Sequence, residues 1–462
     1  MKSIKIFFLL VLCSSAVVTA QNASPKRYAI TDISIVDVEQ KCIQRNKTIF
    51  VEDGLIRKIV SADSGMPLSD YEVVAGRGLF VIPGLIDSHV HYIDPAGFGP
   101  MLISQGVVFM REMGNNTDAA VKERNSLNAG KKFGPEMITT GDYLDGDPPF
   151  IPQITLACSS PDEGRANVDK QVKAGVDEIK TYSGLKKDVF LAIIDECRKE
   201  GIKAVGHVPE TVYIEDAARA GLSSSEHLFG FGNVIAKALG QPFSLKSGGM
   251  GADQVYFLSY PKVDSEKLQA ELRKIGSYGM AVCPTLVEMK SGASLKKIFA
   301  GDYPNLDYVS PFVKGFWKNL WGAQVNNTEI AGQLFPYYKS FLKDLYDAHF
   351  TLLVGTDLLF PGVVPGFSVH EEMEIWQEAG IPQIDILRSA TIVPARFCGV
   401  DKRLGSIEEG KEASFVLLRA NPLDDIRNTS KIDGVFFRGQ FLDRGRLDTL
   451  MVKVKEAAAS GH

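Results

Sequence analysis

Hydrophobic and polar positions follow two different patterns along the chain. Across residues 27–78 the hydrophobic positions have the two-residue period of short strands, and Asp53-Gly54 is typical of a hairpin turn. A similar strand pattern returns near the carboxyl end, at 414–418. We therefore expect a small composite β-sandwich domain, formed by residues 27–78 together with residues 403–445.

The middle of the chain, residues 79–402, alternates short hydrophobic runs with longer helical stretches. This alternation is typical of parallel strands joined by helices. Eight such strands predict an α/β fold, a (β/α)8 barrel of the TIM type, in which the carboxyl ends of the strands form one functional face. The predicted strands are Gly78–Asp87, Gly106–Glu112, Glu136–Thr140, Glu178–Thr181, Lys203–His207, Leu222–Glu226, Met280–Leu286 and Thr351–Thr356.

Two insertions interrupt the alternation. Residues 230–262 are long and glycine-rich, and they follow the sixth predicted strand, which suggests a lid or mobile loop over the barrel mouth. Residues 302–346 contain Trp317 and Trp321 and are predicted to be helical. We favour packing of this second insertion against the barrel or a dimer partner over contact with substrate.

Composition and charge exclude some classes of function. The chain of 462 residues, with 45% hydrophobic and 23% charged residues, has the size and balance of a soluble globular enzyme. Its net charge of -5 provides no basic surface for nucleic acid and no polybasic patch for a membrane. We expect a small-molecule or dipeptide substrate and no nucleic-acid partner, and a homo-oligomer is left open.

The amino-terminal segment predicts export. A positively charged start at 1–5 precedes the hydrophobic run 6–18, and Val18-Thr-Ala20 has the small residues of a signal-peptidase site. The run is too short for a comfortable membrane span, so we expect no stable membrane span. We predict a signal peptide over 1–20 and a periplasmic or secreted protein. A lipidated Cys13 and a buried first helix are less favoured alternatives.

The seven histidines carry most of the chemical information. His89 and His91 end the first predicted barrel strand, and the two-residue period of a strand points both imidazoles to the same side. His207, His227 and Asp357 end the fifth, sixth and eighth predicted strands. Because strand ends meet on one face of a barrel, we expect these residues to share a pocket. Four imidazoles and a carboxylate suit Zn²⁺ or a similar borderline metal.

Substrate contacts are harder to predict. Tyr182 and Arg111 lie near the ends of predicted strands and are tentative substrate-binding residues. His370 begins the helix after the eighth strand, and a place at the pocket rim and a role in packing are equally open. His349 precedes the eighth strand and is predicted to be structural, and His462 is the last residue of the sequence.

Several motifs occur along the chain in a characteristic order. They are Gly84-Leu-Ile-Asp-Ser-His-Val-His91, Gly206-His-Val-Pro209, Gly355-Thr-Asp357, Ser389-Ala-Thr-Ile-Val-Pro-Ala395 and Leu404-Gly-Ser-Ile-Glu-Glu-Gly-Lys411. Together, and in this order, they resemble the amidohydrolase superfamily, in particular the branch of imidazolonepropionase and the metal-dependent Xaa-Pro dipeptidases. The resemblance extends over nearly the full chain after the predicted signal peptide.

The resemblance implies a centre with two divalent metal ions, for which we expect Zn²⁺. Lys180, at the end of the fourth predicted strand, would react with CO₂ to give a carbamate that bridges the two ions. The ligands would be His89, His91 and Asp357 for one ion, and His207 and His227 for the other.

The implied reaction is metal-dependent hydrolysis. A water bridging two ions would have its pKa lowered and act as the nucleophile, and Asp357 would serve as general base and then as general acid. We predict cleavage of amide bonds in small substrates such as dipeptides or N-acyl amino acids. A lactonase, an arylesterase or a cyclic amide hydrolase on the same centre is the alternative. A deaminase, or a non-catalytic metal-binding derivative of the scaffold, is less favoured.

Overall fold

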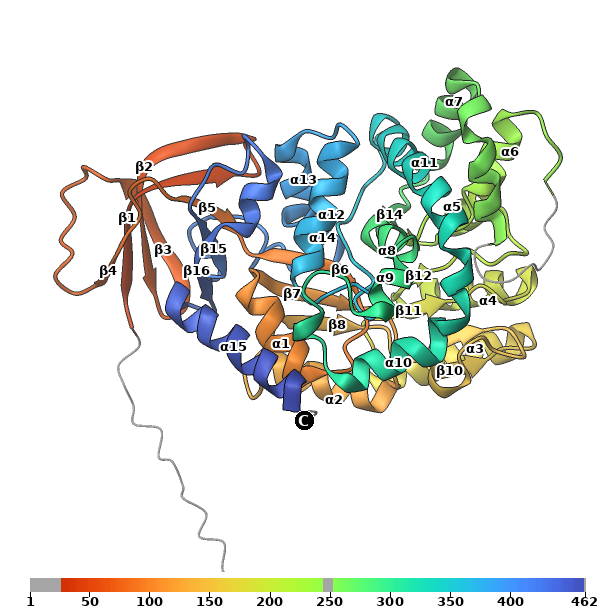
Figure 1. Ribbon diagram of the computed structural model, residues 1–462, viewed down its shortest axis with the longest axis horizontal. Coiled ribbons are helices and arrows are strands. Elements are labelled where there is room, and N and C mark those ends of the chain that lie inside the picture. The colour runs from red at the N-terminus through yellow and green to blue at the C-terminus, as the bar shows by residue number, and fades with distance from the viewer. Residues whose placement is uncertain (1–25, 244–251, 461–462) are drawn as a thin grey trace, which may run out of the picture.

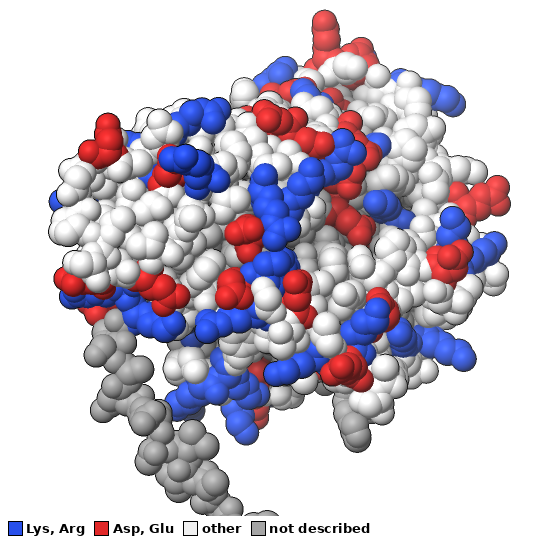
Figure 2. All heavy atoms as spheres, turned by 60° about the vertical axis from the view of Figure 1, so that its left-hand side comes forward, with Lys and Arg blue, Asp and Glu red and all other residues white. Residues whose placement is uncertain are grey.

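The computed structural model of the protein describes residues 26–243 and 252–460. The predicted signal peptide over 1–20 and the glycine-rich part of the 230–262 insertion lie outside the described residues. Within the described part of the chain, no helix is both long and apolar enough to cross a membrane. On the face drawn in Figure 2, basic and acidic side chains are interspersed, so neither sign of charge dominates that face.

Strands from both ends of the described chain form one mixed sheet of eight strands, which we call the terminal sheet. Its members are β1 (Tyr28–Asp37), β2 (Cys42–Glu52), β3 (Leu55–Ser61), β4 (Glu72–Ala75), β5 (Phe80–Pro83), β15 (Phe415–Leu418), β16 (Ile432–Phe437) and β17 (Gln440–Asp443). Their order is β17-β16-β15-β5-β1-β2-β3, and β4 pairs with β1. The sheet lies to one side of the helix-rich remainder in Figure 1. A composite β element is therefore present, and its closure into a sandwich and the domain boundaries remain predictions.

The terminal sheet is held by an apolar face. Phe415 and Phe436 are fully buried and stack with their ring centroids 4.6 Å apart, and Tyr28 meets Phe436 edge-on at 5.3 Å. The hairpin predicted at Asp53-Gly54 is confirmed, because these two residues connect β2 and β3. Both have positive φ, 51° and 78°, as a two-residue turn between twisted strands requires.

Parallel strands form the centre of the remaining chain, in two sheets. One sheet contains β6 (Leu85–Val90), β7 (Val107–Glu112) and β8 (Glu136–Thr139), in that order. The other contains β9 (Tyr143–Asp145), β10 (Thr155–Ala157), β11 (Glu178–Thr181), β12 (Lys203–Gly206), β13 (Ser224–Glu226) and β14 (Ala281–Cys283). Its order is β10-β9-β11-β12-β13-β14.

Backbone contacts join the two parallel sheets on both sides. Isolated parallel bridges pair Val282 of β14 with Leu352, and Val90 of β6 with Leu358, so the segment 351–358 lies between β14 and β6. On the other side, the N–H of Asp177 donates to the carbonyl oxygen of Thr139 at 2.9 Å, next to β11 and β8. The protein is thus an α/β fold with parallel sheets.

The structure corrects the first and the last predicted strands. The run Gly78–Asp87 is divided between two sheets, because β5 pairs with β1 and β15 whereas β6 pairs with β7. The chain changes sheet at Gly84, where an added Cβ would lie 2.4 Å from Val108. The run Thr351–Thr356 forms only an isolated bridge, and left-handed residues, including Asp357 with φ 57°, follow it directly. The strands β9 and β10 were not predicted.

Helices follow most of the parallel strands and lie mainly outside them (Figure 1). Helix α3 (Pro161–Ala174) shows how the sequence determines where a helix begins and ends. The Ser160 side chain accepts from the N–H of Glu163, Pro161 occupies the first turn, and Gly175 ends the helix with φ 89°. The largest hydrophobic cluster lies between strands and helices. The α-helices are α1 (Pro95–Ser104), α2 (Thr117–Asn128), α3 (Pro161–Ala174), α4 (Lys187–Glu200), α5 (Ile214–Ala220), α6 (Gly232–Ala238), α7 (Ser265–Gly276), α8 (Leu286–Gly292), α9 (Leu295–Ala300), α10 (Pro311–Trp321), α11 (Thr328–Asp347), α12 (Phe367–Glu378), α13 (Gln383–Ser389), α14 (Ile392–Phe397) and α15 (Arg444–Ser460).

Short 3-10 helices connect several of these elements. They are η1 (Pro152–Ile154), η2 (Ala252–Lys262), η3 (Leu306–Tyr308), η4 (Gly322–Asn327) and η5 (Ile426–Ser430). The insertion 302–346 consists of η3, α10, η4 and α11, which confirms its predicted helical character.

Candidate metal centre

The carboxyl ends of the parallel strands carry the predicted metal ligands, and the structure brings all of them together. His89 lies in β6 and Lys180 in β11, and His207 and His227 directly follow β12 and β13. Asp357 follows the bridging segment 351–358.

Short distances connect these side chains. The Oδ1 atom of Asp357 lies 3.3 Å from Nε2 of His89 and 3.3 Å from Nε2 of His91. The Nζ atom of Lys180 lies 3.4 Å from Nε2 of His89. The imidazole ring of His227 is centred 4.6 Å from that of His89 and 5.1 Å from that of His207. We call this group of six residues the histidine cluster.

Two members of the histidine cluster have a left-handed backbone. The φ angles of His227 and Asp357 are 58° and 57°, a region that residues other than glycine seldom adopt. Neighbouring strands hold both positions: the N–H of His227 donates to the carbonyl of Cys283 at 3.1 Å, and that of Asp357 donates to the carbonyl of His89 at 2.9 Å. Backbone strain of this kind is concentrated at functional sites.

The Nδ1 atom of every cluster imidazole contacts a protein oxygen. The partners are Glu226 Oε2 at 3.0 Å for His89, Gly114 O at 2.9 Å for His91, Ser183 Oγ at 2.9 Å for His207 and Thr285 Oγ1 at 2.7 Å for His227. Such contacts fix the orientation of each ring and leave Nε2 as the atom for a ligand.

Two atoms of the histidine cluster suit a cation. Nε2 of His207 and Oδ1 of Asp357 are buried and have no hydrogen-bond partner among the described residues. Leaving a buried polar atom unpaired costs about 1–3 kcal/mol, so most such atoms have a partner. Ligand atoms of His89, His91 and Asp357 also lie within 4.8 Å of one another. Imidazole nitrogens with a carboxylate are ligands that Zn²⁺ and related metals accept, so the residues fit a metal centre.

Burial controls the charges in the cluster. Loss of water contact lowers the pKa of His89 and of His207 well below the usual range, which keeps both imidazoles neutral, the form that binds metals. Burial also lowers the pKa of Lys180 to about 8. Burial would raise the pKa of Asp357, but its contact with His91 and the other nearby imidazoles hold it well below its usual range.

Glu288 also contacts the histidine cluster, although the sequence analysis did not single it out. Its Oε2 atom lies 3.0 Å from Nδ1 of His227 and accepts from the hydroxyl of Thr285 at 3.2 Å. Burial would lower the pKa of His227, but the neighbouring carboxylate of Glu288 raises it above the usual value. The sequence contained one indication of this role, because Glu288 is an acidic residue just beyond the seventh predicted strand.

Arg111 lies beneath the histidine cluster, away from solvent. Its side chain is fully buried and donates to Glu178 at 2.6 Å, to Glu226 at 3.2 Å and to the hydroxyl of Ser224 at 2.8 Å. Since Glu226 also contacts Nδ1 of His89, Arg111 reaches the site through that carboxylate, and it also donates to the carbonyl of Ser88, next to His89, at 3.3 Å. The structure thus places Arg111 as a positioning residue and gives Glu226, which was not predicted, a direct contact with a ligand.

The structure does not bring His370 to the cluster. His370 lies buried in α12, where its two ring nitrogens contact Thr429 Oγ1 at 2.9 Å and the carbonyl of Gln105 at 3.1 Å. For His370 a place at the pocket rim and a role in packing were both left open, and these contacts match the role in packing. Tyr182, in contrast, stacks on His207 with centroids 4.2 Å apart.

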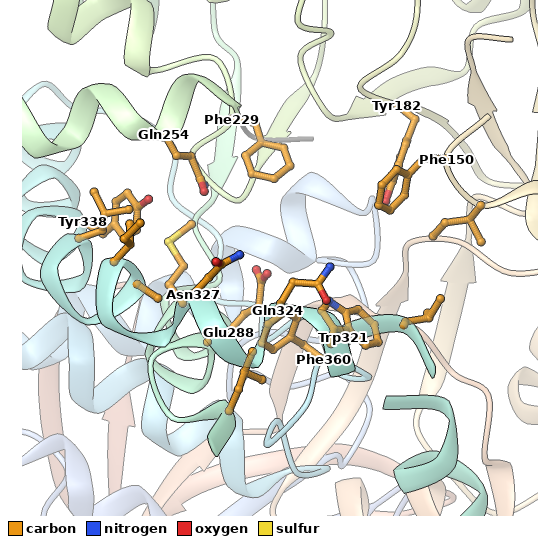
Figure 3. Close-up of a pocket in the computed structure, with 18 residues that line it drawn as sticks. Phe150, Tyr182, Phe229, Gln254, Glu288, Trp321, Gln324, Asn327, Tyr338 and Phe360 are labelled. Atoms are coloured by element: carbon orange, nitrogen blue, oxygen red, sulfur yellow. The ribbon is translucent and has the colours of Figure 1, made fainter. Parts of the chain in front are cut away.

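A cavity of about 660 Å³ lies next to the histidine cluster (Figure 3). Tyr182, Phe229 and Glu288 line it, and each also contacts His207 or His227. This volume is ordinary for a small-molecule site.

The helical insertion supplies much of the remaining cavity wall, and Gln254 of η2 adds to it. Trp321, Gln324 and Asn327 line the cavity, so the 302–346 segment also forms part of a cavity wall, and its contact with substrate stays a prediction. Trp317 does pack, because it is buried and its indole N–H donates to the carbonyl of Leu359 at 2.7 Å.

Part of the chain matches known proteins in sequence. Residues 340–442 match the model of the amidohydrolase family. A dihydroorotase of Carboxydothermus hydrogenoformans is 45% identical over 62 residues, which span 12% of this chain and 14% of that relative. The matched part is therefore a small fraction of the curated relative's length.

Solved structures share the fold over most of the chain. A bottromycin amidohydrolase has a TM-score of 0.72 at 23% identity and covers 94% of this chain and 91% of its own. A Xaa-Pro dipeptidase with bound methionine in its active site has a TM-score of 0.66 at 19% identity and covers 90% of this chain and 100% of its own. The chain therefore shares the fold of these hydrolases over most of its length, and its residues 340–442 match the amidohydrolase family model.

Proposed function

We propose that the protein is a binuclear metal hydrolase that cleaves amide bonds of small substrates, with dipeptides and N-acyl amino acids as the first candidates. The observation that carries this proposal is the histidine cluster, in which all four Nδ1 atoms contact protein oxygens while Nε2 of His207 and Oδ1 of Asp357 are buried and unpaired among the described residues.

The residues divide into two ligand groups. His89, His91 and Asp357 would hold one divalent ion and His207 and His227 the other, with Lys180 carboxylated between them. Bound Zn²⁺ ions would polarise the scissile carbonyl and lower the pKa of a water molecule.

The protein's own groups then act around the substrate. Asp357 is the carboxylate placed to accept a proton from the attacking water and to return it to the leaving amine, and its low pKa leaves it ionised at neutral pH. Tyr182, stacked on His207, lines the cavity and is placed to contact the substrate. Glu226, held by Arg111, keeps the His89 ring in place.

The wider setting is also part of the proposal. The two parallel sheets, joined through Leu352 and Leu358, would close into the predicted (β/α)8 barrel. Residues 1–20 would direct export to the periplasm or the outside of the cell and then be removed.

Metal analysis together with a hydrolysis screen tests the function. The chain from Gln21 onwards, loaded with zinc, should contain roughly two metal equivalents and hydrolyse members of a set of dipeptides and N-acyl amino acids. Lys180→Ala should lose metal and nearly all activity, whereas His370→Gln, which changes a buried histidine outside the cluster, should keep both ions. A chain without metal that cleaves none of the amides would overturn the proposal. Hydrolysis confined to lactones or esters would overturn the amide part.

A further inference from the structure

The cavity beside the histidine cluster has two unlike sides. Figure 3 shows Phe229 and Tyr182 on one side of the space, and Glu288, Gln324 and Trp321 on the opposite side. Glu288 is fixed at the cluster end by His227 and Thr285. Gln324 and Trp321 belong to the helical insertion, so this part of the wall comes from a segment of the chain that carries none of the predicted metal ligands.

The lining is hydrophobic, and its described residues include no cation. Most of its side chains are aromatic or aliphatic. Its polar side chains include the carboxamides of Gln254, Gln324 and Asn327. Among the described residues that line this cavity, Glu288 carries the one formal charge, and neither lysine nor arginine is present. A carboxylate entering the cavity would lose water and find carboxamides, aromatic rings and one like charge in exchange.

We propose that this cavity selects amide substrates whose bound part is bulky, hydrophobic and free of a carboxylate. The proposal rests on the proposed function and narrows its substrates. Amides blocked at the carboxyl end should be better substrates than free dipeptides or N-acyl amino acids, which would place a carboxylate in the cavity. Trp321 and Phe360, whose rings lie 5.3 Å apart, would contact the hydrophobic group.

The physical reasons are desolvation and charge. Transfer of an ionised carboxylate to an apolar site is unfavourable without a paired cation, and the carboxylate of Glu288 adds repulsion. A neutral aromatic group gains from leaving water and from edge or face contacts with the aromatic wall. Gln324 is the position at which a single added charge should reverse the selection, because it lines the cavity and is not one of the predicted metal ligands.

Calorimetry with two probes tests the proposal without requiring turnover. N-acetylphenylalaninamide and N-acetylphenylalanine differ only in the charge at the carboxyl end. On the zinc-loaded protein the amide should bind at least roughly tenfold more tightly than the acid. Equal binding, or tighter binding of the acid, would overturn the proposal.

Variants link the preference to this cavity. Gln324→Lys should improve binding of the acid relative to the amide by roughly tenfold, since a hydrogen bond to a charged group replaces a neutral contact. Gln40→Lys adds the same charge in the turn between β1 and β2 and should leave the ratio unchanged. Trp321→Ala should weaken both probes. If Gln324→Lys leaves the ratio of amide to acid affinity unchanged, or if Gln40→Lys changes it as much, this cavity is not responsible for the preference.

Hydrolysis distinguishes the two proposals. N-acetyl-leucyl-phenylalaninamide should have a kcat/KM at least roughly tenfold above that of N-acetyl-leucyl-phenylalanine. If neither is cleaved and no other amide is, the proposed function fails, whereas the probe ratio from calorimetry still decides the selectivity.

Discussion

The terminal sheet has a buried core, and the ends of the parallel strands are buried too, but the two regions bury opposite kinds of side chain. In the terminal sheet Phe415 and Phe436 are 0% exposed and pack against other apolar residues. At the strand ends His89 and Glu226 are also 0% exposed, and Lys180 is 1% exposed. Burial stabilises apolar groups without any particular partner, whereas each buried polar group needs a hydrogen-bond or ionic partner. The structure at the strand ends therefore depends on individual polar contacts.

The two regions also use ion pairs differently. Arg111 and Glu226, beneath the histidine cluster, have side chains with 0% exposure. Arg419 and Asp433, at the terminal sheet, form a 2.8 Å pair with exposures of 53% and 34%. A buried pair leaves an unpaired charge when one member is removed, and an exposed pair leaves one that water solvates. An ion pair of the same chemical kind is therefore needed for stability when it is buried, but not when it is exposed.

The largest effect is expected at Asp357, where the strand-end region would act in catalysis. Asp357→Asn removes the proton acceptor and an anionic ligand and should lower kcat/KM for amide hydrolysis by about 10³-fold or more. Steady-state kinetics on the zinc-loaded variant measures this, with circular dichroism as the control for folding. A loss smaller than about tenfold would remove Asp357 from the proposed mechanism.

Arg111 should have the next largest effect, on stability. Arg111→Met leaves Glu178 and Glu226 buried without their cation and should lower the free energy of unfolding by about 3–5 kcal/mol. Urea unfolding followed by fluorescence provides the measurement. If the variant is as stable as the unmodified chain, the buried pair is not the structural requirement inferred above.

Ser183 should have a smaller effect, on metal affinity. Ser183→Ala removes the contact to Nδ1 of His207 and should weaken metal binding by about 10–100-fold. Thr429→Val removes the equivalent contact to His370 outside the cluster and should leave metal affinity unchanged. Competition with a coloured chelator measures both, and equal affinities in the two variants would contradict the assignment of His207 as a ligand.

The smallest effect is expected at Arg419. Arg419→Met breaks an exposed pair and should change the free energy of unfolding by no more than about 1 kcal/mol. The same urea experiment serves for Arg419→Met and for Arg111→Met. Comparable losses in both would show that burial does not separate the two regions.

The strand ends and their histidines could be predicted because the evidence is local. The spacing of His89 and His91, and the strand preceding His207, are visible within a few residues. The hairpin at Asp53-Gly54 is local too. The division of the first predicted strand at Gly84 was not visible, because β5 and β6 have the same hydrophobic character and differ only in the strands with which they pair.

The environment of the site could not be predicted, because its contacts join distant parts of the chain. Arg111 binds carboxylates 67 and 115 positions away, at Glu178 and Glu226. Glu288 and Trp321 reach the cavity from segments whose sequence patterns indicate only helices. Polar partners at such separations follow from three-dimensional packing rather than from periodicity.

The pairing of β15 with β5 has a consequence for biosynthesis. β5 continues through Gly84 into β6, the strand that carries His89, yet its partner β15 lies far later in the sequence. During folding β5 must therefore keep one edge unpaired until Phe415–Leu418 have been synthesised. A product of premature termination before residue 415 would lack β15 and would expose that open sheet edge to protein quality control.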